Sequence, residues 1–340
     1  MLAYLLRRYG RPEGASLMEV PEPTVGPRDI LVDVRAAGLN PVDFKTRQGK
    51  LRAIYRPKLP LVLGNEFAGE VVAVGDQVKR FAAGDRVFAR VEKDRLGCFA
   101  ERAAVGEDCA AHMPAKLEFE AAAGVPLAAL TALQALRDEL SLKAGQKVLI
   151  SGGAGGVGTF AIQIAKWLGA HVTTTASKRG EALVRALGAD EVIDYTTDDL
   201  SRIAKDFDAG FDLIGGAALD RMFKVMKPGT KIVSVAAVPE PQTALRDLGG
   251  RRALAAIFWV ISYGVRQRAR RASVGYRYLY MHPSGNDLAL LADLIEQGRL
   301  RVIVDRTYPF AEIAAAFDYL ESGRAKGKVV VVQPPSALRP

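Results

Sequence analysis

The chain has 340 residues, of which 49% are hydrophobic and 25% charged, and its formal net charge is +9. This composition excludes a disordered or fibrous protein, and the length exceeds the roughly 100–200 residues of one domain, so we expect two domains. The positive charge fits an anionic cofactor, and it also fits a nucleic-acid or acidic-membrane partner.

Cysteine usage and hydropathy restrict the class further. The only cysteines, Cys98 and Cys109, cannot build a disulfide framework, and neither has the spacing of a metal ligand. The longest apolar stretch runs from Leu254 to Val265, which is about half of the ~20 residues that cross a bilayer. The N-terminus has no signal-peptide pattern. We therefore expect a cytoplasmic protein without a metal site.

The first part of the chain, up to about residue 115, consists of short strands separated by Gly, Pro and Asp. Closely spaced strands with tight turns are typical of a small β-barrel-like domain. The expected strands are Ile30–Ala36, Glu70–Val74, Arg86–Arg90 and Phe99–Val105.

From about residue 120, buried strands alternate with helix-length segments. This alternation predicts right-handed βαβ crossovers and a parallel, doubly wound sheet. A helix over Asp287–Gln297 and a last strand over Lys328–Val332 follow. The expected strands of the sheet are Lys147–Ser151, His171–Ala176, Glu191–Ile193, Phe211–Ile214 and Lys231–Ala236.

A glycine motif lies between the first strand of this sheet and an amphipathic helix that extends to Leu168. The order strand, glycines, helix gives the G-x-G-x-x-G pattern a mechanism, because backbone N–H groups approach a pyrophosphate at the N-terminus of the helix. A merely tight turn would not need four glycines. We predict dinucleotide binding by Gly153, Ala154, Gly155, Gly156, Val157 and Gly158.

The next strand ends at Ala176 without the acidic residue that accepts hydrogen bonds from the ribose of NAD. Ser177, Lys178 and Arg179 follow instead, and a hydroxyl with two cations suits the 2′-phosphate of NADPH. The alternative is a solvated start of a helix, where positive charge is mildly unfavourable. The sequence therefore favours NADPH over NADH.

These features and several other stretches resemble the medium-chain dehydrogenase/reductase superfamily, in particular its zinc-free quinone oxidoreductase branch. The resemblance implies a GroES-like catalytic domain (residues 1–124), a Rossmann domain (125–283), a C-terminal segment (284–340) that returns to the catalytic domain, and a homodimer. The matching stretches are Ala37–Asp43, Gly64–Gly69, Gly75-Asp76, Gly84–Val87, the glycine motif, Leu187–Tyr195 and Arg324–Val329.

The resemblance also assigns residues to the cofactor. Ser177 and Tyr195 would line the 2′-phosphate pocket, although Tyr195 could also be an ordinary aromatic residue at a strand edge. Thr131 resembles the family's threonine on the nicotinamide side, and Lys326 in the last matching stretch is placed with the cofactor residues.

Zinc-dependent relatives carry Cys and His where this chain has Asn40 and Asn65. Asparagine is a poor zinc ligand, so we expect hydride transfer from NADPH to an activated C=C of an α,β-unsaturated carbonyl, or to a quinone, without zinc. Asn40, with Lys45 and Asp43 on the same loop, is the expected donor to the developing enolate oxygen. Asn40 could instead cap a turn, and Lys45 could be solvated. Tyr55 is a further candidate proton donor, with water as the alternative.

The segment 251–281 combines arginines with an apolar run. Three interpretations stay open: contact of Phe258, Trp259, Tyr278 and Tyr280 with substrate or a second subunit, contact with anionic lipid, and a solvated loop. Two competing functions also stay open. One is an NADP-dependent alcohol dehydrogenase, and the other is a non-catalytic NADPH-binding protein with a basic surface for RNA or membrane, although no specific nucleic-acid motif occurs.

Overall fold

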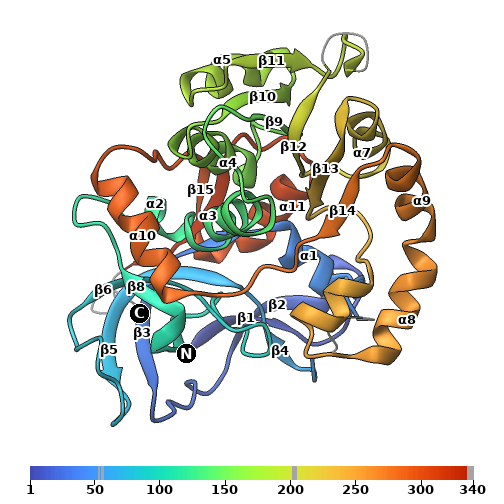
Figure 1. Cartoon of the computed structure of the whole chain (residues 1–340). Coiled ribbons are helices and arrows are strands. Elements are labelled where there is room, and N and C mark those ends of the chain that lie inside the picture. Colours follow the sequence, from blue (N-terminus) through green and yellow to red (C-terminus); the bar gives the residue numbers. More distant parts are fainter. Residues whose placement is uncertain (53, 55–56, 201–204, 335–340) are drawn as a thin grey trace. The chain divides into compact units, whose positions relative to one another are not determined.

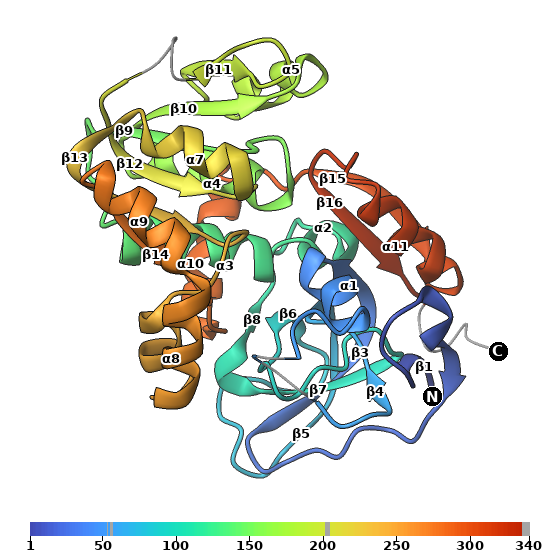
Figure 2. The same ribbon diagram turned by 90° about the vertical axis from the view of Figure 1, so that its right-hand side faces the viewer.

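The computed structural model describes residues 1–52, 54, 57–200 and 205–334, and the chain forms two units (Figures 1 and 2). Unit 1 comprises Met1–Leu130 and His282–Pro340, and unit 2 comprises Thr131–Met281. The first boundary lies inside helix α3 (Pro126–Leu133), whereas the sequence placed it between residues 124 and 125. The second boundary lies between Met281 and His282, whereas the sequence placed it between residues 283 and 284.

Unit 1 contains a seven-stranded sheet in the order β15-β16-β3-β5-β6-β8, with β7 paired to β3, and a small sheet in the order β2-β1-β4. The C-terminal strand β16 pairs antiparallel with β3. Two expected strands have the predicted bounds, and the others are longer or shifted. The strands are β1 (Leu2–Leu6), β2 (Ala15–Glu19), β3 (Asp29–Leu39), β4 (Leu61–Val62), β5 (Glu66–Val74), β6 (Arg86–Arg90), β7 (Arg102–Gly106), β8 (Ala110–His112), β15 (Val304–Pro309) and β16 (Lys328–Val332).

The core of unit 1 joins the two ends of the chain. The ring of Phe317, on a C-terminal helix, stacks on Tyr4 at 5.5 Å and meets the edge of Phe99 at 5.8 Å between centroids. All three side chains are buried, and a fully buried phenylalanine contributes about 1.5–3 kcal/mol through the hydrophobic effect. The C-terminal segment is therefore an integral part of the core of unit 1.

The helices of unit 1 are short. Asp43 and Lys45, which the sequence placed on a loop with Asn40, lie on α1; the loop assignment was wrong. Asn40 at the N-cap, Pro41 at the first position and Asp43 at the third are residues that begin a helix. The helical segments are η1 (Pro12–Gly14), α1 (Pro41–Arg47), η2 (Glu107–Cys109), α2 (Phe119–Ala123), α10 (Gly285–Glu296), η5 (Phe310–Glu312) and α11 (Ile313–Glu321).

Unit 2 is built on a six-stranded, parallel sheet in the order β11-β10-β9-β12-β13-β14. This confirms the doubly wound sheet. Strand β12 ends at Asp212, earlier than expected, because the Asp212 carboxylate accepts hydrogen bonds from the N–H groups of Ile214 and Gly215 and turns the chain. The strands are β9 (Lys147–Ile150), β10 (His171–Ala176), β11 (Glu191–Asp194), β12 (Phe207–Asp212), β13 (Met226–Ser234) and β14 (Gly275–Tyr278).

The helices of unit 2 connect these strands. In α4 the predicted apolar stripe is buried, as Phe160, Ala161 and Ile164 show. In the described ranges we find no helix that combines the length and the apolar character needed to span a membrane. The helical segments are η3 (Gln134–Glu139), α4 (Gly156–Trp167), α5 (Lys178–Ala186), α7 (Gly216–Phe223), η4 (Thr243–Asp247), α8 (Arg252–Ile261) and α9 (Tyr263–Arg271).

Candidate functional site

The glycine turn of unit 2 connects the end of β9 to the start of α4 and is fastened to β10. The N–H of Gly152 donates to Thr175 Oγ1, and the N–H of Gly153 donates to the Thr175 carbonyl, both at 3.0 Å. The N–H of Gly155 donates to Gly152 O at 3.1 Å, which closes the turn. The turn therefore has a fixed place at the carboxyl end of the sheet, where dinucleotides bind in doubly wound folds.

Three of the glycines are required by close approach or backbone conformation. A Cβ on Gly158 would lie 2.4 Å from Gly152 O, and one on Gly153 would lie 2.1 Å from Thr174 Oγ1. Gly152 has φ +71°, in the left-handed region that favours glycine. A Cβ on Gly155, by contrast, would meet only Gly152 O, at 3.5 Å. The turn thus packs tightly on one side and is open at Gly155, where a phosphate could approach the backbone.

Helix α4 supplies donors for such a phosphate. Its N-cap is Gly155, and the N–H groups of Gly156, Val157 and Gly158 lie in its first turn, where N–H groups have no partner within the helix. Such an N-terminus favours an anion. Beside the turn, the side chain of Ile214 is 59% exposed, and its Cδ1 would lie 2.8 Å from a Cβ on Gly152. A bound dinucleotide could cover this apolar side chain.

The next two strands bring the predicted 2′-phosphate residues together. In the β10/β11 register Ala176 is opposite Asp194, so Ser177 and Tyr195 leave the sheet side by side. Ser177 is the N-cap of α5, and Lys178 and Arg179 in the first turn are exposed. Tyr195 is 54% exposed. The structure therefore places a hydroxyl, two cations and a phenol at one end of the sheet.

An acid at this corner, Asp194, is engaged both by its own loop and by the backbone of Lys178. Its Oδ1 accepts hydrogen bonds from the N–H of Thr196 at 2.9 Å and from the Thr196 hydroxyl at 2.7 Å. These bonds lower the pKa of Asp194, and the charge of Lys178 contributes in the same direction. At the end of β10 itself, the position of the ribose-binding acid in NAD enzymes, the residue is Ala176.

A buried acid that the sequence analysis missed ties three strands together at the same edge. Asp212 is completely buried, and its carboxylate accepts from the Ser151 hydroxyl at 3.0 Å and the Ser234 hydroxyl at 2.6 Å. The three residues follow or end β9, β12 and β13. The available signal was an acid at the end of an apolar strand.

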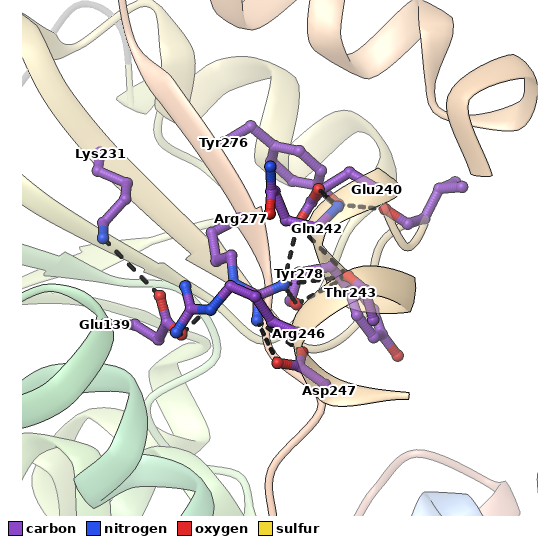
Figure 3. A network of polar contacts seen from close by, with 11 residues as sticks. Glu139, Lys231, Glu240, Gln242, Thr243, Arg246, Asp247, Tyr276, Arg277 and Tyr278 are labelled. Carbon is purple, nitrogen blue, oxygen red and sulfur yellow. Dashed lines mark hydrogen bonds and ion pairs between the residues drawn. The ribbon is translucent and has the colours of Figure 1, made fainter. Parts of the chain in front are cut away.

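A second feature that the sequence analysis missed is an ion network centred on Arg277 of β14 (Figure 3). Its Nη2 binds both oxygens of Asp247 at 2.7 and 2.6 Å, and its Nη1 binds Glu240 Oε1 at 2.9 Å. Glu139 lies 3.4 Å from Nε and also pairs with Arg246 at 3.0 Å. The network fixes the segment that follows β13.

Three other residues that the sequence assigned to the cofactor or to proton transfer lie away from the glycine turn in the chain. Thr131 lies on α3 at the start of unit 2 and is buried. Lys326, between α11 and β16, is partly exposed and belongs to unit 1. Tyr55, together with Ala53 and Arg56, lies outside the described residues. The assignments of Thr131 and Lys326 to the cofactor stay predictions.

The polar centre of unit 1, which we call the Lys328 cluster, consists of Asn40, Asp43, Asn65, Glu66 and Lys328. The Nζ of Lys328 donates to Asn40 Oδ1 at 2.6 Å, Glu66 Oε1 at 2.8 Å and Leu39 O at 3.2 Å. Asn40 Nδ2 donates to Glu66 Oε1 at 2.6 Å. All five side chains are buried. Asn40 and Glu66 therefore face an internal cation.

Asp43 is held by two amides in the same cluster. Its Oδ1 accepts from Asn65 Nδ2 at 2.6 Å and its Oδ2 from the N–H of Asn40 at 2.8 Å. Burial raises the pKa of Asp43 to about 7, against the opposing effect of these hydrogen bonds. This carboxyl group consequently changes charge near neutral pH.

The predicted donor Asn40 is committed to the Lys328 cluster, because Nδ2 donates to Gly38 O at 3.3 Å as well as to Glu66. Lys45 is half-buried on α1, and burial lowers its pKa, with the charge of Lys50 acting in the same sense. The structure thus brings Asn40 together with Asp43 and Asn65, and it gives Lys45 a different environment.

Taken together, a doubly wound sheet with an anion-binding glycine turn and a separate β-rich unit define a two-unit, dinucleotide-binding α/β protein. Residues 26–117 match the family model described as "Alcohol dehydrogenase GroES-like domain", and residues 187–331 match the one described as "Zinc-binding dehydrogenase".

Similar proteins cover nearly the whole chain. It is 37% identical to NADPH-dependent alkenal/one oxidoreductase, chloroplastic, of Arabidopsis thaliana, over 97% of this chain and 79% of that one. The structure of the quinone oxidoreductase from Coxiella burnetii is 33% identical with a TM-score of 0.84, and covers 98% of this chain and 99% of its own. The Escherichia coli quinone oxidoreductase complexed with NADPH is 26% identical with a TM-score of 0.83, over 98% and 100%. The chain belongs to the medium-chain dehydrogenase/reductase superfamily, in its quinone oxidoreductase branch, as the sequence predicted.

Proposed function

We propose that this protein is an NADPH-dependent reductase that transfers hydride to the activated C=C of an α,β-unsaturated carbonyl, or to a quinone, without zinc. The observation that carries the proposal is the arrangement at the carboxyl end of β9, β10 and β11. There the glycine turn and the group Ser177, Lys178, Arg179 and Tyr195 lie on neighbouring strands. The similar proteins named for alkenal/one and quinone reduction support the substrate class.

In this proposal the residues of unit 2 hold the cofactor. The first turn of α4 binds the pyrophosphate, Ser177 and Tyr195 bind the 2′-phosphate by hydrogen bonds, and Lys178 and Arg179 bind it by charge. When bound, NADPH would supply the hydride. Asp212 and the Arg277 network act indirectly, because they hold the loops at this edge of the sheet in place.

Zinc independence is supported by the Lys328 cluster. The amides of Asn40 and Asn65 stand where zinc-dependent relatives carry Cys and His, and amides are poor ligands for zinc. The Lys328 ammonium, 2.6 Å from Asn40 Oδ1 and 2.8 Å from Glu66 Oε1, would also repel a divalent cation. In the described part of the chain, no group of three or more His, Cys, Asp or Glu residues has the arrangement of a metal site. These residues do not fit a catalytic zinc.

Lys45 is the better candidate than Asn40 for the donor to a developing enolate oxygen. The amide hydrogens of Asn40 already have acceptors in the Lys328 cluster, whereas Lys45 takes no part in that cluster. We expect Lys45→Met to lower kcat by about 100-fold or more, as loss of an oxyanion donor does, with little change in the KM for NADPH. Lys50→Met, an exposed neighbour, is the matched control. Equal effects of the two substitutions would exclude Lys45 as the donor to the enolate oxygen.

We also propose a cytoplasmic homodimer. Buried, free Cys98 and Cys109 suit a reducing compartment. The edge strands β11 and β14 offer backbone groups for pairing with a second sheet. Sedimentation velocity tests the dimer, and a monomer at assay concentration contradicts it. Cell fractionation tests the compartment.

The reaction is tested by following NADPH absorbance with a panel of enals, enones, quinones and, in the reverse direction, alcohols with NADP⁺. Consumption of NADPH with enones or quinones is expected. Oxidation of alcohols alone would favour the alcohol dehydrogenase interpretation. Tight NADPH binding without any turnover would favour a non-catalytic binding protein.

Cofactor selectivity is tested by the double variant Lys178→Gln/Arg179→Gln. A charge-assisted hydrogen bond contributes about 1.5–3 kcal/mol, so we expect NADPH affinity to fall by at least about tenfold while NADH affinity changes little. Arg185→Gln on the same helix is the control, because Arg185 pairs with Glu181 at 2.9 Å. An equal loss for both dinucleotides would contradict 2′-phosphate recognition.

A further inference from the structure

The segment that contains α8 and α9 has an unusual charge pattern. From Leu248 to Asn286 the sequence has seven arginines and no acidic residue. This stretch therefore supplies much of the net charge of +9. Within unit 2, α8 lies at the opposite end from β11 and α5 in both views (Figures 1 and 2), away from the proposed 2′-phosphate residues.

Helix α8 is apolar on two faces. Leu254, Ala255 and Phe258 are buried, and the helix packs on η4. The outer face is also apolar: Ile257 is 54%, Val260 65% and Ile261 51% exposed. A helix on the surface of a globular protein normally turns polar residues outward. The outer face of α8 is thus suited to a partner with an apolar interior.

Exposed apolar side chains are concentrated in this segment. Among the described residues outside α8 and α9, the large hydrophobic side chains that are more than half exposed are Tyr195 and Ile214, both beside the proposed cofactor site. Trp259 and Tyr263, each 55% exposed, extend the apolar face of α8. Aromatic side chains of this kind favour the boundary between a bilayer and water.

Helix α9 and the start of α8 supply the positive charge. In the described part of the chain, Arg252, Arg270 and Arg271 are exposed and form no ion pair. Arg266 stacks on Trp259 at 5.3 Å and donates to its carbonyl at 2.7 Å. Arg268 pairs with Asp220 at 2.6 Å and joins α9 to α7. Exposed arginines thus precede the apolar side chains of α8 in the chain, at Arg252, and follow them at the end of α9.

We propose that α8 and α9 form a surface that binds anionic lipid bilayers. The apolar side chains of α8 enter the boundary between headgroups and acyl chains, and Arg252, Arg270 and Arg271 bind lipid phosphates. A second activity is not involved: the surface would deliver the protein to a membrane, where apolar enones and quinones accumulate.

Two other occupants fit less well. A second copy placed by a two-fold axis on this face would bring the same arginines together without acids to pair them, and like charges oppose such a contact. Nucleic acid would pair with the arginines but would leave the side chains of Ile257, Val260 and Ile261 in water. Anionic lipid satisfies both properties of the surface.

The experiment is co-sedimentation of the whole protein with vesicles of phosphatidylcholine, with and without about one third phosphatidylglycerol. We expect binding that depends on phosphatidylglycerol and weakens when salt rises from ~0.1 M to ~1 M, because the screening length falls from about 10 Å to about 3 Å. Arg270→Gln/Arg271→Gln should reduce the partition coefficient by about fivefold for each arginine. Ile257→Ser/Val260→Ser should reduce it by at least about tenfold, because apolar burial is lost.

Matched controls separate this surface from net charge and general stickiness. Arg11→Gln/Arg299→Gln removes two other exposed arginines, and Val72→Ser/Val74→Ser removes two side chains of β5 that are 40% exposed. Both controls should bind vesicles like the wild type. All variants should retain NADPH turnover, which reports on folding.

Several outcomes would overturn the proposal. They are absence of vesicle binding by the folded wild type, equal losses in the controls, and binding that ignores phosphatidylglycerol. Self-association of the wild type that Ile257→Ser/Val260→Ser abolishes would identify the face as a subunit interface. Salt-sensitive binding to RNA but not to vesicles would assign the arginines to nucleic acid.

Discussion

The Lys328 cluster of unit 1 and the Arg277 network of unit 2 balance a buried cation in different ways. The Nζ of Lys328 donates hydrogen bonds to Asn40, Glu66 and a backbone carbonyl, and these residues are all buried. Arg277 binds several carboxylates, and one of them, Glu139, also pairs with Arg246 and Lys231, which are 58% and 40% exposed. The Lys328 cluster is closed to solvent, whereas the Arg277 network reaches the surface. Loss of a charge should therefore cost more in unit 1.

The largest effect is expected for Lys328→Met. The substitution leaves the Glu66 carboxylate buried without its cation, and breaking a buried ion pair costs about 3–5 kcal/mol. The free energy of unfolding, measured by urea denaturation, should fall by that amount. Lys224→Met, at an exposed site, should change it by less than about 0.5 kcal/mol.

A smaller effect is expected for Arg277→Lys. The charge remains, but one ammonium group cannot keep both the contact of Nη1 with Glu240 at 2.9 Å and those of Nη2 with Asp247 at 2.7 and 2.6 Å, since lysine lacks the separate donors of the guanidinium group. We expect a loss of about 1.5–3 kcal/mol in the free energy of unfolding. A loss larger than that for Lys328→Met would reverse the comparison between the two units.

The Lys328 cluster should also make stability depend on pH through Asp43. Its pKa in the folded protein is about 7, raised by burial from the ordinary value of 3.8. The folded state therefore binds more protons than the unfolded state between these values, and the free energy of unfolding falls as pH rises through them, by up to about 1.4 kcal/mol per pH unit. Urea denaturation from pH 5 to pH 8 measures the slope.

The control for this pH dependence is Asp43→Asn. The variant is less stable at low pH, because an amide cannot accept both hydrogen bonds, but its slope should be flatter. The same slope in both proteins would assign the titration to another group.

The smallest effect is expected at the rim of the Arg277 network. Arg246→Gln removes a pair with Glu139 at 3.0 Å, and the Arg246 side chain is 58% exposed, so the free energy of unfolding should change by at most about 1 kcal/mol. A larger loss would mean that the exposed cations Arg246 and Lys231 contribute much of the stability of the network. The difference in solvent exposure between the network and the Lys328 cluster would then matter less for stability.

Local patterns in the sequence predicted the parallel sheet, the glycine turn and the hydroxyl and cations of Ser177, Lys178 and Arg179. Each depends on short strand–turn–helix units, where spacing determines geometry, whereas the place of Tyr195 beside Ser177 followed from the family resemblance. The Lys328 cluster could not be predicted in this way. Lys328 meets Asn40 across 288 positions of the chain, and their contact depends on the antiparallel pairing of β16 with β3. Lys328 lies in the stretch Arg324–Val329 that resembles the family, but its local pattern indicates no role.

The exposure of one face of α8 could not be predicted from the sequence either. Its apolar run was compatible with contact to substrate or a second subunit, with lipid or with a solvated loop, because a run that is apolar all round has no face that periodicity can identify. The helices α8 and α9 show that the loop interpretation was wrong. Only the fold shows that Phe258 is buried while Val260 is exposed.

Unit 2 is continuous in the chain, whereas unit 1 is assembled from both ends. During synthesis on the ribosome, the complete Rossmann sheet emerges before β16 exists, so unit 2 can fold first. Until β16 is made, strand β3 lacks one of its neighbouring strands, and the Glu66 carboxylate lacks the ammonium group of Lys328. A ribosome that stalls just before β16 is made would therefore carry a finished nucleotide-binding unit and an N-terminal sheet that still presents an open edge to chaperones and to other nascent chains.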